Sequence, residues 1–260
     1  MSITLSPNEI HLWFVSTEDI DDDELLERYQ KIISDEEMKK YRRFVFEKDR
    51  TQYLVTRALI RSVLSIYIRD TLPEGWQFIL NDYGKPEVVP EMLPFPLKFN
   101  LSHTNNMIVL AISHDQDVGV DVESLARDLA TDDLAKYAFS SEEYEQIKGL
   151  DSVSFHKRFF DFWTLKESYI KACGMGLSIP LDSFSFLFSE ENRVSIRFDR
   201  ERNDDPKLWK FWQIKPSEQH IVSLAIKIVR SNLPYKLVMR EIVPFTSYSD
   251  VSYPTTSESA

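Results

Sequence analysis

Cysteine is almost missing from the sequence. Cys173 is the single cysteine among 260 residues, which excludes an internal disulfide and any CxxC or Cys/His cluster of the zinc type. A reducing, cytoplasmic environment is therefore expected. Long hydrophobic runs are missing too, because no stretch of about 18 uncharged apolar residues occurs. The first thirty residues also lack a basic stretch followed by an apolar one, so we expect neither membrane spanning nor secretion.

Positive charge is scarce as well. The formal net charge of −11 argues against a general nucleic-acid binder, because such a protein needs a positive field to displace counterions from phosphates. The stretch 39–61 is an exception, because Glu47 and Asp49 are its only acidic residues. Its cations are Lys39, Lys40, Arg42, Arg43, Lys48, Arg50, Arg57 and Arg61. A local basic site on an acidic chain suits a small polyanionic ligand, although solvated helix faces would give the same pattern.

The residue pattern predicts a mixture of helices and strands. A chain of this length with 43% hydrophobic content can bury a core of its own. Helices are expected over 22–31, from Ser34, and over 48–67, 132–148 and 154–173; strands are expected over 3–14, 98–101, 107–113, 118–122, 184–188, 194–198, 208–214, 221–229 and 237–243. This order favours an α+β fold of two similarly built halves, 1–115 and 116–245. Residues 246–260 are rich in Ser, Thr and Tyr, and a disordered tail is expected there.

Two carboxylates lie on a predicted strand, in the segment Val118-Gly-Val-Asp121-Val-Glu123. Because strand side chains alternate, Asp121 and Glu123 share one face, and Val120 and Val122 share the other. Neighbouring carboxylates repel and raise each other's pKa unless a cation lies between them. Mg²⁺ is the natural candidate, since it takes one or two carboxylates and keeps its other positions for water and substrate phosphate. A solvent-facing acidic strand is the alternative.

A second group lies on the predicted helix that ends at Gly174. Trp163, Glu167 and Lys171 are four residues apart, which places them on one helix face with Lys166 beside them. A Glu–Lys pair at this spacing is ordinarily a surface ion pair. The tryptophan on the same face and the glycine-containing turn that follows favour a functional role.

Two shorter motifs add polar groups. Residues 100–104 are Asn-Leu-Ser-His-Thr after a predicted strand, and their hydroxyls and imidazole could contact phosphate oxygens. The Ser–His pair also suggests a hydrolase, but adjacent residues seldom form a triad contact, and no GxSxG elbow is present. A plain loop histidine is a further alternative. Residues 83–86, Tyr-Gly-Lys-Pro, place Lys85 on a turn.

Taken in order, these motifs resemble the surfactin-synthetase type (Sfp-like) of 4'-phosphopantetheinyl transferases. The matching parts are Gly84-Lys85-Pro86, Phe99-Asn-Leu-Ser102-His103, Gly119-Val-Asp121-Val-Glu123 and Trp163-Thr-Leu-Lys166-Glu167-Ser-Tyr-Ile-Lys171 with Gly174-Met-Gly176-Leu177. The similar segments extend from about Ser34 to Leu187. Each motif is weak alone, but four in the same order and spacing form a specific pattern.

The resemblance implies a pseudo-twofold monomer with coenzyme A in the cleft between two α+β halves. It implies transfer of the 4'-phosphopantetheine arm of coenzyme A to a serine of an apo acyl or peptidyl carrier protein, with Mg²⁺ or Mn²⁺ as cofactor and 3',5'-ADP as the second product. Asp121, Glu123 and Glu167 would hold the metal, and Glu167 and Lys171 would be catalytic. The implied coenzyme ligands are Lys40, Arg43, Arg57, Lys85, Ser102, His103, Lys166 and Lys171.

Two positions depart from the family pattern. Glu37 stands three residues before Lys40, where family members often have another lysine, and Tyr53 stands where a small hydroxylated residue is expected. We therefore expect the 3'-phosphate grip and the adenine pocket to differ, whereas the metal ligands are unchanged. For docking of the carrier protein we expect an exposed apolar strip over 126–136, with Phe139 and Tyr144 behind it. Ordinary helix core is the alternative interpretation of these residues.

Two other functions fit the same residues. Another Mg²⁺-dependent enzyme of nucleotide or phosphoester chemistry would use the same carboxylates and would turn over ATP without coenzyme A. A non-catalytic carrier-binding protein would bind coenzyme A or the carrier without adding mass to the carrier, and the presence of both Glu167 and Lys171 argues against it. No nucleic-acid or membrane partner is expected.

Overall fold

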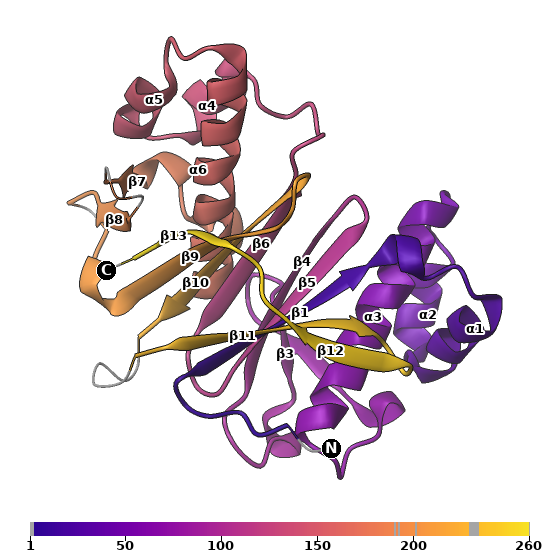
Figure 1. Cartoon of the computed structure of the whole chain (residues 1–260). Coiled ribbons are helices and arrows are strands. Elements are labelled where there is room, and N and C mark those ends of the chain that lie inside the picture. Colours follow the sequence, from indigo (N-terminus) through magenta and orange to yellow (C-terminus); the bar gives the residue numbers. More distant parts are fainter. Residues whose placement is uncertain (1–2, 190, 192, 201, 229–233, 260) are drawn as a thin grey trace.

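Two β-sheets packed face to face form the middle of the molecule, and helices cover their outer faces (Figure 1). The computed structural model describes residues 3–189, 191, 193–200, 202–228 and 234–259. One sheet has the strand order β12-β11-β1-β5-β4, and the other has the order β13-β9-β10-β6. The predicted α+β class is thus confirmed. None of the described helices has the length and apolar character needed to cross a membrane.

The N-terminal half is built on the five-stranded sheet and the long helix α3. Its elements are β1 (Glu9–Ser16), α1 (Asp23–Ile32), α2 (Asp35–Tyr41), α3 (Glu47–Tyr67), β2 (Phe78–Leu80), β3 (Pro86–Val88), β4 (Lys98–Thr104) and β5 (Met107–Ser113). The capping box predicted at Ser34 is present, since Ser34 and Glu37 each accept the other's backbone N–H. Leu54, Ala58 and Val63 of α3 are buried in the core of this half, as their helical spacing predicts.

The C-terminal half repeats this plan with the four-stranded sheet and helix α6. The remaining elements are β6 (Val118–Ser124), α4 (Asp132–Ala138), α5 (Ser141–Ile147), α6 (Ser152–Cys173), β7 (Phe184–Phe188), β8 (Val194–Phe198), β9 (Trp209–Ser217), β10 (His220–Lys227), β11 (Lys236–Val243), β12 (Ser247–Val251) and β13 (Thr255–Glu258). Gly174 caps α6 with a φ of 68°, as expected. The single helix predicted over 132–148 is wrong, because Ser140 forms a capping box with Glu143 and starts α5. The strand predicted to end at Val229 ends at Lys227, because Ile228 is described and lies outside β10; Val229 is outside the described residues.

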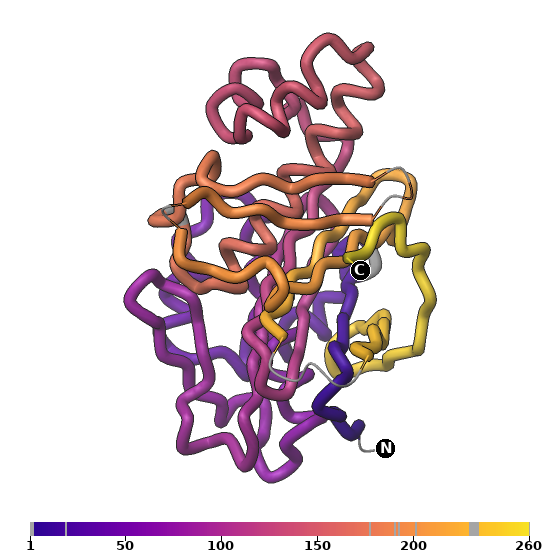
Figure 2. The backbone as a smooth tube through the Cα atoms, turned by 90° about the vertical axis from the view of Figure 1, so that its left-hand side faces the viewer, coloured from indigo at the N-terminus to yellow at the C-terminus, as the bar shows by residue number. Residues whose placement is uncertain are grey.

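The last strands do not all stay in the C-terminal half. β11 pairs in parallel with β1, where Leu237 lies opposite Ile10, and β12 extends the same sheet beyond β11. The chain then crosses back, and β13 pairs with β9. Figure 2 shows this yellow C-terminal segment along one side of the molecule. The predicted second half, 116–245, is therefore wrong in its last part, because β11 and β12 complete the first sheet.

The expected disordered tail is also wrong for residues 246–259. Backbone pairing with β11 and β9 orders this segment, and its Thr, Tyr and Val side chains favour strands. The Tyr253 ring packs edge-on against Phe14, with 4.9 Å between ring centroids, and its hydroxyl donates to the Glu241 carboxylate. Ala260 lies outside the described residues.

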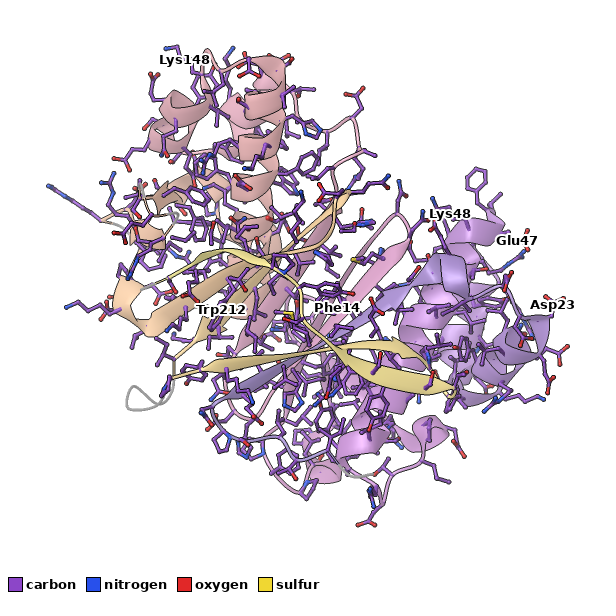
Figure 3. The ribbon with its side chains drawn as sticks, in the orientation of Figure 1. Phe14, Asp23, Glu47, Lys48, Lys148 and Trp212 are labelled. Carbon is purple, nitrogen blue, oxygen red and sulfur yellow. The ribbon has the colours of Figure 1, made fainter. Side chains whose placement is uncertain are left out.

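An apolar layer fills the space between the two sheets. Leu12 and Phe14 come from β1, and Val120, Val122 and Trp212 come from the four-stranded sheet. Figure 3 labels Phe14 and Trp212 near the middle of the molecule. Because the valines of β6 face this layer, the two carboxylates between them project from the opposite face of the sheet, toward α6.

Gly119 lets α6 lie directly on β6. A Cβ at this position would stand 2.1 Å from the carbonyl oxygen of Ser168 and 2.3 Å from the backbone nitrogen of Ala172. Any other residue would push the helix away from the strand. The close approach brings the β6 carboxylates next to Glu167 and Lys171.

Candidate functional site

A pocket of about 360 Å³ lies where the two halves meet. Its walls are Leu101, Ser102 and His103 of β4, Asp121, Val122 and Glu123 of β6, and Trp163, Glu167 and Lys171 of α6. The two carboxylates on a strand face and the Trp-Glu-Lys helix face, predicted from two different periodicities, therefore line one pocket.

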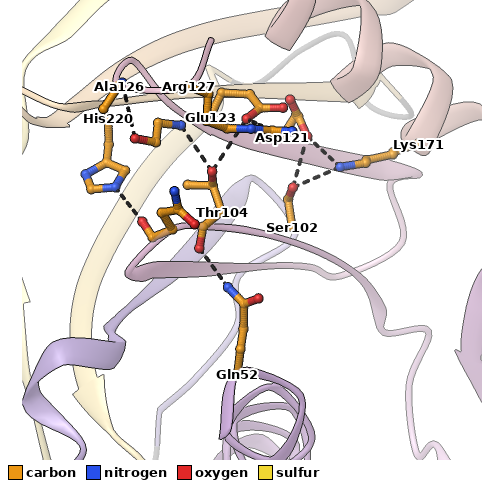
Figure 4. Close-up of polar contacts among 11 residues, drawn as sticks. Gln52, Ser102, Thr104, Asp121, Glu123, Ala126, Arg127, Lys171 and His220 are labelled. Carbon is orange, nitrogen blue, oxygen red and sulfur yellow. Dashed lines mark hydrogen bonds and ion pairs between the residues drawn. The ribbon is translucent and has the colours of Figure 1, made fainter. Parts of the chain in front are cut away.

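Asp121 is the centre of a hydrogen-bonded cluster (Figure 4). The residue is 4% exposed, and its Oδ1 accepts from Lys171 Nζ at 2.6 Å and from Ser102 Oγ at 2.9 Å. Lys171 Nζ also donates to Ser102 Oγ at 2.9 Å. Burying a carboxylate without an opposite charge is unfavourable, and the Lys171 ammonium group supplies that charge. One oxygen thus joins β4 of the first half to β6 and α6 of the second.

Glu123 has a partner from each half. Arg127 Nη1 donates to Glu123 Oε2 at 2.5 Å, and Thr104 Oγ1 donates to the same oxygen at 3.5 Å. Gln52 of α3 in turn donates to the Thr104 carbonyl oxygen at 2.7 Å. Burial raises the pKa of Glu123, and the Asp121 carboxylate raises it further.

Glu167 completes the acidic side of the pocket. Its side chain makes no hydrogen bond or ion pair with the residues that the structure describes. Burial raises the pKa of Glu167, and the Asp121 and Glu123 carboxylates add to this effect. Three carboxylates against the two cations Lys171 and Arg127 leave an excess of negative charge, which suits a cation.

The donor set suits a metal ion that is shared with a substrate. In the described part of the chain, no group of three or more His, Cys, Asp or Glu side chains is arranged so that it could hold a metal by itself. Asp121 Oδ2, however, is buried without a hydrogen-bond partner among these residues. Mg²⁺ needs only one or two protein carboxylates when water and substrate phosphate complete its shell, so an unpartnered carboxylate oxygen at this place fits it.

Lys85 and His103 border the site in different ways. Lys85 Nζ donates to the carbonyl oxygens of Lys171 at 2.8 Å and Val118 at 3.1 Å, so it holds the end of α6 against β6. Burial lowers the pKa of Lys85. His103 lines the pocket itself, where burial and the neighbouring Lys171 ammonium lower its pKa.

Glu37 forms ion pairs with two cations of the basic stretch and leaves others exposed. Arg57 Nε donates to Glu37 Oε1 at 2.6 Å, and Arg61 Nη2 donates to Glu37 Oε2 at 2.8 Å. Burial alone would raise the pKa of Glu37, but the two guanidinium groups keep it low. Arg57, a predicted coenzyme ligand, is thus engaged inside the first half, whereas Lys40 and Arg43 are exposed.

The second departure, Tyr53, borders the exposed Lys40. The Tyr53 ring centroid lies 5.4 Å from Lys40 Nζ and 5.2 Å from the centroid of Phe44. A pair of aromatic rings, in place of a small hydroxyl, therefore forms the surface beside this lysine.

Lys166 does not reach the pocket. Its side chain is 1% exposed, and its Nζ lies 2.7 Å from Glu143 Oε2 and donates to the carbonyl oxygens of Leu181 and Phe184. Consecutive helix residues point about 100° apart, so the neighbour of Glu167 faces the core. The prediction that Lys166 binds the coenzyme is therefore wrong, and this residue instead ties α6 to α5 and β7.

The sequence motifs do not identify Gln52, Arg127 or His220 as site residues. Gln52 and His220 hold the turn after β4 from opposite sides, since His220 Nε2 lies 2.9 Å from the carbonyl oxygen of Asn105. Figure 4 shows this turn between the two halves, beside the acidic cluster. Thr104 belongs to the Ser-His-Thr segment, whose hydroxyls the sequence offers as polar contacts, whereas Gln52, Arg127 and His220 lie outside the four motifs.

Two family models match the chain. Residues 117–225 match the 4'-phosphopantetheinyl transferase superfamily. Residues 21–115 match the N-terminal part of 4'-phosphopantetheinyl transferases. The two matches together cover both strands and the helix that line the pocket.

Individual relatives are similar over most of the chain. The 4'-phosphopantetheinyl transferase HetI of Nostoc sp. is 31% identical over 86% of this chain and 90% of its own length. The 4'-phosphopantetheinyl transferase Sfp of Bacillus subtilis is 34% identical over 76% of this chain and 85% of its own length. A solved holo-(acyl-carrier-protein) synthase from Bacillus anthracis, in complex with CoA (3',5'-ADP), covers 43% of this chain and 94% of its own, at 18% identity and a TM-score of 0.36.

Both halves of the chain and the pocket between them match one class of enzyme, a transferase. The chain belongs to the 4'-phosphopantetheinyl transferase family. Its similarity to Sfp and to the ffp protein of Bacillus subtilis places it with the Sfp-like members.

Proposed function

We propose that the chain transfers the 4'-phosphopantetheine arm of coenzyme A to a serine of an apo acyl or peptidyl carrier protein and releases 3',5'-ADP. The observation that carries the proposal is the pocket between the halves, where the carboxylates of β6 and α6 meet Lys171 and the hydroxyl of Ser102. Membership of the transferase family supports the same reaction.

The cationic and hydroxyl groups suit the phosphates of coenzyme A. We assign the pyrophosphate to Lys171, Ser102 and His103, which line the pocket, and the 3'-phosphate to the exposed Lys40 and Arg43. Lys85 would act indirectly, because its Nζ donates to the carbonyl oxygens of Lys171 and Val118 and so holds α6 in place. Arg57 acts indirectly in this assignment, because its ion pair with Glu37 fixes α2 against α3. Phosphoryl transfer depends mainly on positioning and on neutralisation of charge, which these groups supply.

A divalent metal belongs to the proposed site. Asp121 would hold Mg²⁺, or Mn²⁺ as another hard cation, through its unpartnered Oδ2, together with Glu123 and Glu167. A metal held there would supply positive charge that offsets the negative charge on the phosphoryl group in transfer. Lys171 and Arg127 balance the same carboxylates through their ion pairs.

The transfer step needs a base near the acceptor serine. The serine oxygen bonds to the pantetheine-side phosphorus, and the pyrophosphate P–O bond to the nucleotide breaks. The hydroxyl proton passes to Glu167 or to a water molecule that Glu167 holds. Burial raises the pKa of Glu167, which favours proton uptake, whereas coordination to the metal would make its carboxylate a weaker base.

Mass spectrometry of an apo carrier domain tests the proposal. Incubation with the enzyme, coenzyme A and Mg²⁺ should add about 340 Da to the carrier, the mass of the transferred arm. A chelator should suppress the gain, and added Mg²⁺ or Mn²⁺ should restore it. An enzyme that binds coenzyme A but leaves the carrier mass unchanged would refute the transfer.

We further propose that the enzyme is a cytoplasmic monomer. The free thiol of Cys173 fits a reducing compartment.

A further inference from the structure

The segment expected to dock the carrier protein does not offer an apolar surface. Over 126–136 the exposed side chains beyond Ala126 are polar or charged, while Leu129 and Leu134 are half-buried against the core of the C-terminal half. Phe139 behind them is buried as well. A carrier that approaches the pocket would therefore gain little apolar contact from residues 126–136.

A hollow of about 530 Å³ lies beside the pocket, between the N-terminal part of α6, the ends of β9 and β10, and β13. We call it the docking hollow, and its apolar lining is Leu125, Val153, Phe188 and Ile221. Val153 is 78% exposed at its edge, which is a large exposure for a valine in a helix.

The docking hollow adjoins the acidic cluster. Ile221 lies directly opposite Glu123 in the β10–β6 pair, so the two side chains share one face of the sheet about 5 Å apart. Leu125 follows Glu123 by two residues. His220, which also lines the hollow, contacts the turn after β4 through the Asn105 carbonyl oxygen. A molecule seated in the hollow would thus reach the edge of the pocket.

Cations surround this apolar surface. Lys157 and Arg158 of α6 and Lys215 of β9 line the hollow, in a chain whose net charge is −11. Lys215 Nζ lies 2.7 Å from the Glu218 carboxylate, so it is partly neutralised. Lys157 is exposed and forms no ion pair with the described residues. Arg158 lies over the Phe188 ring, 4.2 Å from its centroid, and only 3.7 Å separates its Nη1 from the Asp161 carboxylate. An apolar floor with a basic rim complements an acidic partner that presents apolar side chains.

We propose that the docking hollow binds the apo carrier protein, with apolar side chains near its acceptor serine on Leu125, Val153 and Phe188 and its carboxylates on the rim. The inference rests on the proposed transfer reaction and adds the place where its protein substrate binds. The uncharged pantetheine arm is a poorer match, because it would gain nothing from the rim cations.

Two variants test the docking hollow without disturbing the fold. Val153→Asp removes the exposed apolar edge and adds a negative charge in the first turn of α6, where an acidic residue is favourable for the helix. Lys157→Glu reverses one unpaired rim charge. Lys207→Glu is the matched control, because Lys207 is exposed, carries the same charge and precedes β9 at the end opposite Lys215.

Steady-state kinetics with an acidic apo carrier domain separate the outcomes. Both variants should raise the KM for the carrier about tenfold and leave the KM for coenzyme A unchanged, and high salt should reduce the effect of Lys157→Glu. A carrier KM within twofold of that of Lys207→Glu would overturn the proposal. A rise in the coenzyme A KM instead would assign the hollow to the pantetheine arm. An anisotropy titration with the labelled carrier reads docking even if wild-type enzyme transfers nothing, so failure of the reaction and failure of the docking site remain distinct.

Discussion

Asp121→Asn is the sharpest perturbation of the candidate site. The amide can still accept hydrogen bonds from Lys171 and Ser102 at the place of Oδ1, so the cluster keeps its shape. The amide nitrogen, however, takes the place of the unpartnered Oδ2 and turns an acceptor into a donor. The substitution therefore removes a negative charge and a metal ligand without opening a cavity.

The expected effects on transfer and on folding differ in size. Loss of one preorganised electrostatic group costs about 2.7 to 4 kcal/mol of transition-state stabilisation, which is a fall in kcat of about 10² to 10³. The Lys171 ammonium loses its ionic partner, but repulsion of Glu123 and Glu167 is relieved, because Asp121 contributes to the raised pKa of both. We therefore expect the free energy of unfolding to change by only about 1 kcal/mol.

The assay measures the mass gain of an apo carrier at saturating coenzyme A, with a Mg²⁺ titration and a calorimetric Mg²⁺ binding curve for each protein. Asp117→Asn is the control, since Asp117 is a nearby aspartate just before β6 whose side chain is half exposed. Its Oδ1 lies 3.9 Å from Lys98 Nζ. The control should behave as wild type. If Asp121→Asn keeps more than about a tenth of the wild-type kcat and binds Mg²⁺ equally well, Asp121 is not a metal ligand.

Three further substitutions test the structural basis of the site. Glu143→Ala should lower the free energy of unfolding by about 3 to 5 kcal/mol in chemical denaturation, because it leaves the buried Lys166 ammonium group without its partner. The coenzyme A KM of the folded fraction should not change. A changed KM with wild-type stability would show that Lys166 takes part in coenzyme binding. The wild-type protein should lose stability as the pH rises from about 4 to 7, because Asp161 becomes charged, and Asp161→Asn should abolish this loss. Burial raises the pKa of Asp161 to about 6, so the folded protein favours the protonated form, and the asparagine variant should gain up to about 3 kcal/mol at pH 7; an unchanged stability–pH profile would contradict this. Gly119→Ala should cost about 3 kcal/mol or more and lower kcat by displacing α6, whereas a variant of wild-type melting temperature would show that the helix does not approach so closely.

The pocket follows from local periodicity, which is why the sequence predicts most of it. Alternation along β6 places Asp121 and Glu123 together, and a spacing of four along α6 aligns Trp163, Glu167 and Lys171. Both rules need only neighbours in the chain. Whether the β6 face and the α6 face meet depends on packing, which the sequence pattern does not reveal. The need for Gly119 in β6 becomes clear only from its short distance to the backbone of α6.

The errors arise where distant contacts decide the outcome. Lys166 and Lys171 lie on the same helix, but Lys166 points into the core and Lys171 points into the pocket. The partner of Lys166 is Glu143, which lies in α5, a helix that the sequence pattern merges with α4. The Ser-Ser-Glu-Glu segment from Ser140 to Glu143 carries the capping signal that separates these helices. Likewise, the polar composition after residue 245 suggests disorder, because strand pairing with β9 and β11 is not visible in the segment itself.

The parallel pairing of β1 with β11 has a consequence for how the protein is made. His11 and Val238 are register partners although they are 227 positions apart in the sequence, so the first sheet cannot close until β11 has left the ribosome. The N-terminal half would wait during synthesis with the edge of β1 open to other strands. A fragment ending near residue 115 should share this exposed edge and aggregate, and a split enzyme would have to be divided elsewhere. Activity in the cell is thus coupled to synthesis of β11 to β13, since the strands that finish one sheet are followed by a strand that pairs with the other.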